Sequence, residues 1–220
     1  MLLFRFMNEK YAMRALRERR LRISRIEHLN DEFEFIGLAL KERKARKALQ
    51  KTRSHLHSKS GIICMSKRWR SPLLWGHYTD NLRGIALGFE VNASKFHEVQ
   101  YVAKRPRLED LGHKTLDDIT PADIRQLMLT KFDAWAYEEE RRGFFHLNEG
   151  KKINGETHFF EPFSDQMELN QVIVGPRSST SRAEVSEALG NLSKTVETFK
   201  ARAAFQDFSI IRNRNDKLWK

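Results

Sequence analysis

The stretch Gly84–Val91 reads GIALGFEV, and its alternating β-branched and aromatic residues are typical of a β-strand. Strands are also predicted at Leu2–Phe6 and at Gly61–Ser66, both earlier in the chain. Between Gly61–Ser66 and Gly84–Val91, the segment Trp75–Asn81 is expected to form an aromatic and polar turn. Shorter strands are expected at Leu21–Ser24, Val99–Val102 and Val172–Val174, and from about Arg142 within Trp135–Leu147.

Helices are predicted in most of the remaining segments. Asn8 can cap a helix that runs to about Arg20. Thr120 and Pro121 open another helix in the cap-then-proline order, and it extends to about Phe132. Two longer helices are expected at Phe33–Leu56 and at Ser181–Phe205, the second with apolar residues at Val185, Leu189, Leu192, Val196 and Phe199.

These elements follow one another without a regular βαβ alternation. The predicted fold class is therefore α+β, with a mixed or antiparallel central sheet and flanking helices. No repeat or linker divides the chain, so a single domain over residues 1–220 is expected. Short apolar stretches and the lack of a signal-peptide pattern predict a cytoplasmic protein without membrane spans. A single cysteine, Cys64, excludes an internal disulfide framework and a cysteine-based structural zinc site.

The chain is strongly basic, with 40 Lys and Arg against 29 Asp and Glu and a net charge of +11. Such a charge favours nucleic acid, ribosomes or an acidic protein as partners. The densest basic run is the best candidate for a phosphate-tracking surface. A solvated helix face is the other interpretation of this run. It consists of Lys41, Arg43, Lys44, Arg46, Lys47, Lys51 and Arg53.

The motifs of the common nucleotide-binding and hydrolase classes are absent. The sequence contains no G-x-x-x-x-G-K-[ST] or G-x-G-x-x-G run, and no H-E-x-x-H or G-x-S-x-G. These classes therefore receive no support from sequence motifs.

Four segments in order resemble domain-of-unknown-function family 2971, which occurs in bacteria and their prophages. They are LRISRIEHLNDEFE at Leu21–Glu34, ICMS at Ile63–Ser66, LWGHYTDNLRGIALGF at Leu74–Phe89 and KFDAWAYEEER at Lys131–Arg141. A fifth, NQVIVG, extends the resemblance to about residue 180. Glu32 stands where the family has proline, and Asn170-Gln171 where it has an acidic residue.

Four polar residues in these and neighbouring segments suit chemistry on a sugar. Arg5 offers a planar fork for a phosphate or ribose, and the Ser66 hydroxyl can hold a sugar or a carboxylate. On an extended segment, Glu138 and Glu140 would point to the same side. One carboxylate can then stabilise an electron-poor sugar carbon while the other deprotonates a nucleophile.

This order is similar to the arginine–serine–glutamate class of ADP-ribosyltransferases, which implies NAD as the co-substrate. The resemblance implies that Arg5 binds NAD with support from Ser66, while Glu140 contacts the nicotinamide ribose and Glu138 addresses the acceptor. In a prophage setting, it implies a toxin or phage-defence effector acting on nucleic acid or protein, with an antitoxin as a further partner.

An aromatic cluster beside these residues has two interpretations. Trp75, His77 and Tyr78 can stack a nicotinamide or a nucleobase, with His77 contributing a hydrogen bond or a proton. Alternatively, the two larger rings anchor a tightly packed turn, with their polar atoms at its surface.

Other interpretations of the carboxylates remain open. Arg5 can pair with Asp31 or Glu34 instead of a ligand, and a helical Glu138–Arg142 would point the two glutamates apart. A non-catalytic, basic nucleic-acid-binding module needs only the basic run and exposed aromatic residues. A metal-dependent nuclease would draw Mg²⁺ or Mn²⁺ ligands from Asp133, Glu138, Glu140 and His146.

Overall fold

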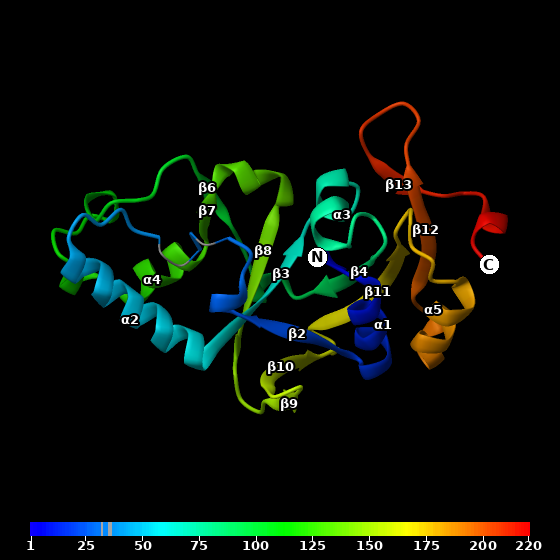
Figure 1. Ribbon diagram of the computed structural model, residues 1–220, viewed down its shortest axis with the longest axis horizontal. Coiled ribbons are helices and arrows are strands. Elements are labelled where there is room, and N and C mark those ends of the chain that lie inside the picture. The colour runs from blue at the N-terminus through cyan, green and yellow to red at the C-terminus, as the bar shows by residue number, and fades with distance from the viewer. Residues whose placement is uncertain (32, 35–36) are drawn as a thin grey trace.

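A computed structural model describes residues 1–31, 33–34 and 37–220. Over these residues the main sheet has eleven strands, ordered β13-β12-β11-β4-β1-β3-β2-β10-β9, with β8 beside β3 and β5 beside β8 (Figure 1). The strands are β1 Leu2–Met7, β2 Arg20–Arg25, β3 Ser60–Ser66, β4 Ile85–Val91, β5 Phe96–Glu98, β6 Gln100–Val102, β7 Thr130–Phe132, β8 Glu140–His146, β9 Lys151–Ile153, β10 Glu156–Pro162, β11 Met167–Val174, β12 Glu197–Ala203 and β13 Ile210–Arg212. The helices are α1 Glu9–Glu18, α2 Arg43–Lys59, α3 Pro72–Tyr78, α4 Pro121–Met128 and α5 Arg182–Leu189.

Most neighbouring strands are antiparallel, as in the pairs of β1 with β4 and of β3 with β8. Two pairs are parallel: β11 with β12 in the main sheet, and β6 with β7 in a separate two-stranded sheet. The predicted α+β class with a mixed sheet and flanking helices is therefore confirmed.

Residues that alternate along the central strands face different helices. Leu3 and Leu87 belong to the core that includes α1 and α5, whereas Phe6 and Ala86 belong to a second core with Trp75 of α3. Helices consequently cover the sheet on both sides, with α1 and α5 in mutual contact (Figure 1). The period of two that predicts a strand from GIALGFEV is the physical basis of this layering.

Three of the four predicted helix starts are confirmed by their caps, including Ser181, which forms a capping box with Glu184 at the start of α5. The Asn8 side chain accepts from the main-chain N of Tyr11 at the start of α1, and Thr120 and Asp123 form a capping box at the start of α4. Helix α4 ends earlier than predicted, at Met128, and Thr130–Phe132 forms β7 instead.

The predicted helix over Ser181–Phe205 is wrong beyond Leu189. Gly190 has a φ of 51° there, and a short 3₁₀ segment leads from it into β12. In β12 the side chains of Phe199 and Ala201 are buried, with a period of two rather than 3.6. Val196 and Phe199 match helical spacing by coincidence, because Val196 lies in the bend before β12 and Phe199 lies on β12.

Two other segments also differ from expectation. The helix predicted at Phe33–Leu56 starts only at Arg43, and residues 35–36 of that range lie outside the described residues. Within the predicted turn at Trp75–Asn81, the first residues are the end of α3, and the turn itself has positive φ angles at Asp80, Asn81 and Leu82.

The sheet divides at one edge of β3. One edge of β3 pairs with β8 along its whole length, from Ser60↔His146 to Ser66↔Glu140. The other edge pairs with β2 near its start, at Ile62↔Ser24, and with β1 at its end, at Phe4↔Ser66. Between these two points β1 and β2 diverge, and a side chain satisfies the exposed strand edge: Arg5 donates to the main-chain O of Cys64.

Candidate active site

A cavity of about 200 Å³ lies at the point where β1 and β2 diverge along β3. Apolar residues such as Leu29 and Leu74 form part of its wall, and the rest is polar. The polar and charged residues of the wall are Arg5, Ser24, His28, Asn30, Glu34, Ser66, Tyr78, Lys131, Glu138 and Glu140.

The four residues predicted to be catalytic all line this cavity. Strand register explains why: Phe4 pairs with Ser66, which pairs on its other side with Glu140. Arg5, Ser66 and Glu140 therefore come from the adjacent strands β1, β3 and β8. Glu138 lies two residues before β8, at the end of a 3₁₀ helix.

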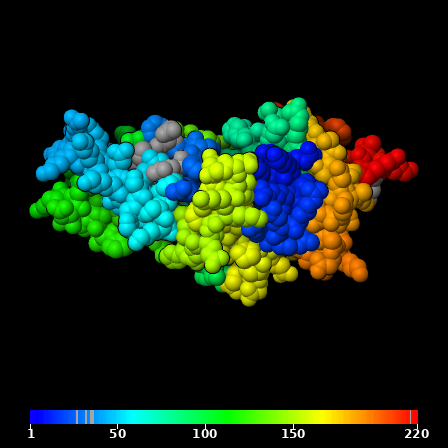
Figure 2. Space-filling view, turned by 60° about the horizontal axis from the view of Figure 1, so that its bottom comes forward, coloured from blue at the N-terminus to red at the C-terminus, as the bar shows by residue number. Residues whose placement is uncertain are grey.

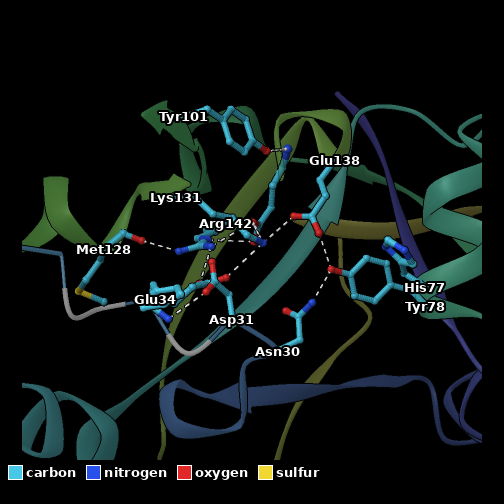
Figure 3. Close-up of polar contacts among 12 residues, drawn as sticks. Asn30, Asp31, Glu34, His77, Tyr78, Tyr101, Met128, Lys131, Glu138 and Arg142 are labelled. Atoms are coloured by element: carbon cyan, nitrogen blue, oxygen red, sulfur yellow. Dashed lines mark hydrogen bonds and ion pairs between the residues drawn. The ribbon is translucent and has the colours of Figure 1, made fainter. Parts of the chain in front are cut away.

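Lys131 of β7 is the centre of a buried charge cluster (Figure 3). Its Nζ lies 2.6 Å from Oε2 of Glu138, and 3.2 Å from a carboxylate oxygen of both Glu34 and Glu140. The residue is only 5% exposed. A single ammonium group therefore draws three carboxylates from distant parts of the chain to one place.

Arg142 is the second cation of the cluster and is 0% exposed. Its guanidinium makes two hydrogen bonds to Glu140, of 2.9 and 3.0 Å, and lies 2.6 Å from Oε2 of Glu34. It also donates to the main-chain O of Met128 at 2.8 Å. This fork fixes the Glu140 carboxylate in one orientation.

The cluster contains three carboxylates and two cations, and its members titrate differently. Burial opposes the ionisation of Glu140, but Arg142 and Lys131 outweigh it and lower its pKa to about 2. For Glu34, burial prevails over the same two cations and raises its pKa. Burial alone would lower the pKa of Lys131, yet the carboxylates, Glu140 first, raise it.

Glu138 is held on its other side by a tyrosine. The hydroxyl of Tyr78, on α3, donates to Oε1 of Glu138 and accepts from Nδ2 of Asn30 at 2.8 Å. Burial and the neighbouring Glu138 raise the pKa of Tyr78, so its hydroxyl stays protonated and remains a donor. One oxygen of Glu138 thus faces Lys131 and the other faces Tyr78 at the cavity wall (Figure 3).

The backbone around the two glutamates is neither the extended segment nor the continuous helix considered for it. Glu139 has a left-handed conformation, with a φ of 43°, between the 3₁₀ helix Asp133–Glu138 and β8. This left-handed residue ends the 3₁₀ helix directly before β8 begins. Both flanking carboxylates nevertheless reach Lys131, so they share one site for a different reason from the one predicted.

Arg5 does not pair with Asp31 or Glu34. It donates to the main-chain O of Cys64 at 2.7 Å and to the Ser24 hydroxyl at 3.5 Å. In the part of the chain that the structure describes, Arg5 forms no ion pair, whereas Lys131 forms three. The cavity therefore has one guanidinium group that keeps its capacity for an anion.

Ser66 and the aromatic cluster are only partly as predicted. The Ser66 hydroxyl bonds to the main chain of Arg68 rather than to a carboxylate. Tyr78 lines the cavity, but Trp75 is 0% exposed and donates its indole N–H to the main-chain O of Trp69 at 2.6 Å, so its ring cannot stack a ligand. The exposed His77 bonds to Tyr137 at 2.7 Å, outside the cavity wall.

The predicted nucleic-acid-binding residues lie on and just before α2 (Figure 1), and none of them lines this cavity. Lys41, Arg43, Lys44, Arg46, Lys47 and Lys51 are exposed, and Arg53 is half-buried. Arg46 donates to the main-chain O of Lys41 at 2.6 Å. The structure thus presents an exposed basic helix, separate from the charge cluster.

The four residues considered as metal ligands are not gathered into one site. His146 and Glu140 stand at opposite ends of β8, six residues apart, which is about 20 Å along a strand. Glu138 and Glu140 instead share the ammonium of Lys131. Over residues 1–31, 33–34 and 37–220, no group of three His, Cys, Asp or Glu side chains is placed to hold a metal ion.

Sequence reasoning missed Lys131, Glu34 and Arg142 as members of the site. Lys131 and Glu34 stand inside the segments that carry the family resemblance, and Arg142 follows directly after one of them. Their positions in or beside those segments were the sequence signal from which they could have been found. Spacing alone offered no signal, because Lys131 lies on β7, Arg142 on β8 and Glu34 in a turn.

Comparison with protein-family models, with curated proteins and with solved structures finds no match for this chain. Among the described residues, no helix is both long enough and apolar enough to cross a membrane.

Proposed function

We propose that the chain is an NAD-dependent ADP-ribosyltransferase whose site is the cavity between β1, β2 and β3. The observation that carries this proposal is the convergence of Arg5, Ser66 and the two glutamates Glu138 and Glu140 on one cavity wall. They come from segments far apart in sequence. Only Arg5 among the cations of this wall retains capacity for an anionic ligand within the described residues, which suits the phosphates of NAD.

The polar wall also fits the ribose of NAD. Ser24, Asn30 and Tyr78 carry hydroxyl and amide groups that can exchange hydrogen bonds with sugar hydroxyls. NAD supplies an activated N-glycosidic bond: nicotinamide leaves with the bonding electrons as the acceptor nucleophile bonds to the ribose carbon. The protein has to hold the sugar, stabilise its positive charge and accept the proton of the nucleophile.

We assign the proton-accepting role to Glu138, because Tyr78 holds one of its oxygens at the cavity wall. Glu140 stays ionised near neutral pH, since its pKa is about 2, and its charge can offset positive charge on the sugar. Lys131 and Arg142 are positioning residues that fix these two carboxylates. Such an activity fits a toxin or phage-defence effector in the cytoplasm, where NAD and nucleic acid occur together.

The experiment compares label transfer from adenine-labelled NAD to cellular RNA, DNA and protein by the wild type and by Glu138→Gln. Loss of a general base lowers the rate by about 10²–10⁴-fold, so the variant should transfer almost no label. The matched control is Glu139→Gln, which changes the neighbouring glutamate, whose carboxylate pairs with Arg68 outside the cavity. This control should keep most of the activity.

Two results would overturn the proposal. One is the absence of both label transfer and nicotinamide release by wild-type protein that circular dichroism shows to be folded. The other is equal transfer by the wild type and by Glu138→Gln.

A second candidate function is a non-catalytic nucleic-acid-binding module. The exposed cations of α2 favour it, because a basic helix face can neutralise phosphates without any chemistry. Charge reversal at Lys44, Arg46 and Lys47 would abolish binding by such a module. Glu138→Gln would leave that binding unchanged.

A further inference from the structure

A second hollow adjoins the cavity and has a different electrostatic character. Its volume is about 440 Å³, and it lies between α1, β2 and the β9–β10 hairpin. Arg5, Phe6, Ser24, His28 and Tyr78 line both hollows, so the two lie side by side. Figure 2 shows the hairpin directly beside α1 on one face of the molecule. We call this second hollow the α1–hairpin groove.

The walls of the α1–hairpin groove are predominantly cationic. Its cations include Arg5, Lys10, Arg14, Arg20 and Arg22. Glu18 is the acidic residue of the wall, and it pairs with both Arg14 and Arg20, at 2.8 and 2.5 Å. The excess of positive charge is therefore not cancelled within the groove.

The charges of this wall also act on a histidine within it. The pKa of His158 is lowered, first by burial and then by the charges of Arg22 and Arg14, against the opposing effect of Glu156. Burial disfavours a charge of either sign, but the contributions of Arg22 and Arg14 have the sign that favours an anion.

Aromatic rings stand among these cations. Tyr11, on α1, is 51% exposed, and the guanidinium of Arg20 lies 3.9 Å from the centre of the Phe160 ring. Tyr78 marks the point where the groove meets the cavity. Cations that track phosphates, combined with aromatic faces on which bases stack, are the features of single-strand binding sites.

We propose that the α1–hairpin groove binds single-stranded nucleic acid and leads one nucleotide into the cavity as the acceptor. This proposal rests on the proposed transferase function for the acceptor role, but not for the binding itself. A duplex would hide its bases from Tyr11 and Phe160, whereas a single strand exposes them. The basic run on α2, which the sequence predicts to bind nucleic acid, then contributes only general electrostatic attraction.

The test measures binding of a fluorescent single-stranded RNA by anisotropy, without NAD, to matched pairs of charge-reversal variants. The groove pair is Lys10→Glu with Arg22→Glu, and the control pair is Lys44→Glu with Lys47→Glu on α2. All four residues are exposed, and both pairs change the net charge equally. The groove pair should weaken binding by roughly tenfold or more, and the α2 pair by roughly threefold or less.

A second groove variant distinguishes a loss of RNA binding from a loss of folding. Lys10→Gln with Arg22→Gln removes charge without adding any, and it should weaken binding by a smaller factor in the same direction. Equal weakening by the groove and α2 pairs would overturn the proposal. Weakening by the α2 pair alone would overturn it too, as would equally tight binding of polyglutamate in place of RNA.

The outcomes for the groove and for the transferase remain distinguishable. Glu138→Gln should bind RNA as tightly as the wild type, because Glu138 is not part of the groove wall. Normal RNA binding at the groove without any label transfer from NAD would contradict the transferase alone. Label transfer that is unaffected by the groove variants would contradict the groove alone.

Discussion

The ammonium of Lys131 is the common partner of Glu34, Glu138 and Glu140. Removing an ammonium ion from water is costly, and here three carboxylates offset that cost. Each carboxylate is buried as well, so each depends on a cation in turn. The cluster therefore couples the stability of the fold to the geometry of the cavity.

Lys131→Met should consequently destabilise the protein strongly. Removing one partner of a buried ion pair costs about 3–5 kcal/mol, because the remaining charges lose compensation. Urea denaturation monitored by circular dichroism measures this loss in the free energy of unfolding. Lys67→Met is the control, since Lys67 pairs with Glu98 at the surface and such pairs contribute about 0–1 kcal/mol. Equal losses in the two variants would contradict the role given to Lys131.

Glu140 should make stability depend on pH in the acid range. Its pKa is about 2 in the folded protein and 4.5 as an ordinary glutamate. Because the folded pKa is the lower one, the stability gained from ionisation is present above pH 4.5 and is lost as pH falls towards 2.

Urea denaturation of the wild type and of Glu140→Gln, carried out at several pH values, measures this contribution. The difference in unfolding free energy between the two should shrink as the pH falls from about 5 to about 2. A difference that is constant over this interval would contradict the low pKa of Glu140.

The sequence identifies the residues that carry recognisable chemistry but not those that hold them. Arg5, Ser66, Glu138 and Glu140 could be predicted from residue type and order, and the structure brings them together. Lys131 could not, because its segment reads as the end of a helix, whereas β7 places it on a strand. Ion pairs between distant segments leave no periodic pattern in the sequence.

Among the helices α1–α5, α2 has the fewest buried side chains, although it is the longest of them. Within α2, His57 alone is buried. Glu42 stands at the N-cap position of the helix, but its side chain makes no capping hydrogen bond. Its first turn has no acidic residue to complement the helix dipole. A basic helix with these properties is held mainly at its C-terminal end.

The N-terminal half of α2 should therefore open locally far more often than the central sheet. Hydrogen exchange measured by mass spectrometry should show rapid exchange for amides over Arg43–Thr52 and slow exchange for those of β4. The strand is the internal control, since most of its side chains are buried on both faces. Equal protection of the two elements would contradict this assignment.

Elements were predictable where local signals agree with tertiary packing. Asn8 and Thr120 mark true helix starts, because their side chains satisfy orphan N–H groups. The β9–β10 hairpin was missed although Asn154-Gly155, with φ angles of 52° and 83°, is a strong hairpin signal. The strand β12 was mistaken for helix because its pairing with β11 overrides a misleading local spacing.

At the scale of the whole molecule, two basic surfaces of the described residues lie apart from each other. One is the α2 face at one end of the molecule, and the other is the α1–hairpin groove (Figure 1). The cavity beside the groove is lined by the three carboxylates Glu34, Glu138 and Glu140. A polyanion attracted by the net charge of +11 would meet these three carboxylates at the cavity.

This distribution predicts a marked salt dependence for RNA binding. Neutralising roughly three to five phosphates in a single strand gives a slope of about −2 to −3.5 in log binding constant against log salt concentration. Anisotropy titrations over a range of salt concentrations measure the slope, and Lys10→Glu with Arg22→Glu should reduce it. A slope near zero would contradict electrostatic binding in the groove.

The measurement that tests the central claim most directly is mass spectrometry of the acceptor together with quantification of free nicotinamide. The wild type should attach ADP-ribosyl groups and release one nicotinamide for each, and Glu138→Gln should do neither. Nicotinamide release without any modified acceptor would show an NAD hydrolase instead. Release of no nicotinamide, by folded protein supplied with RNA, DNA and protein, would contradict a transferase site at this cavity.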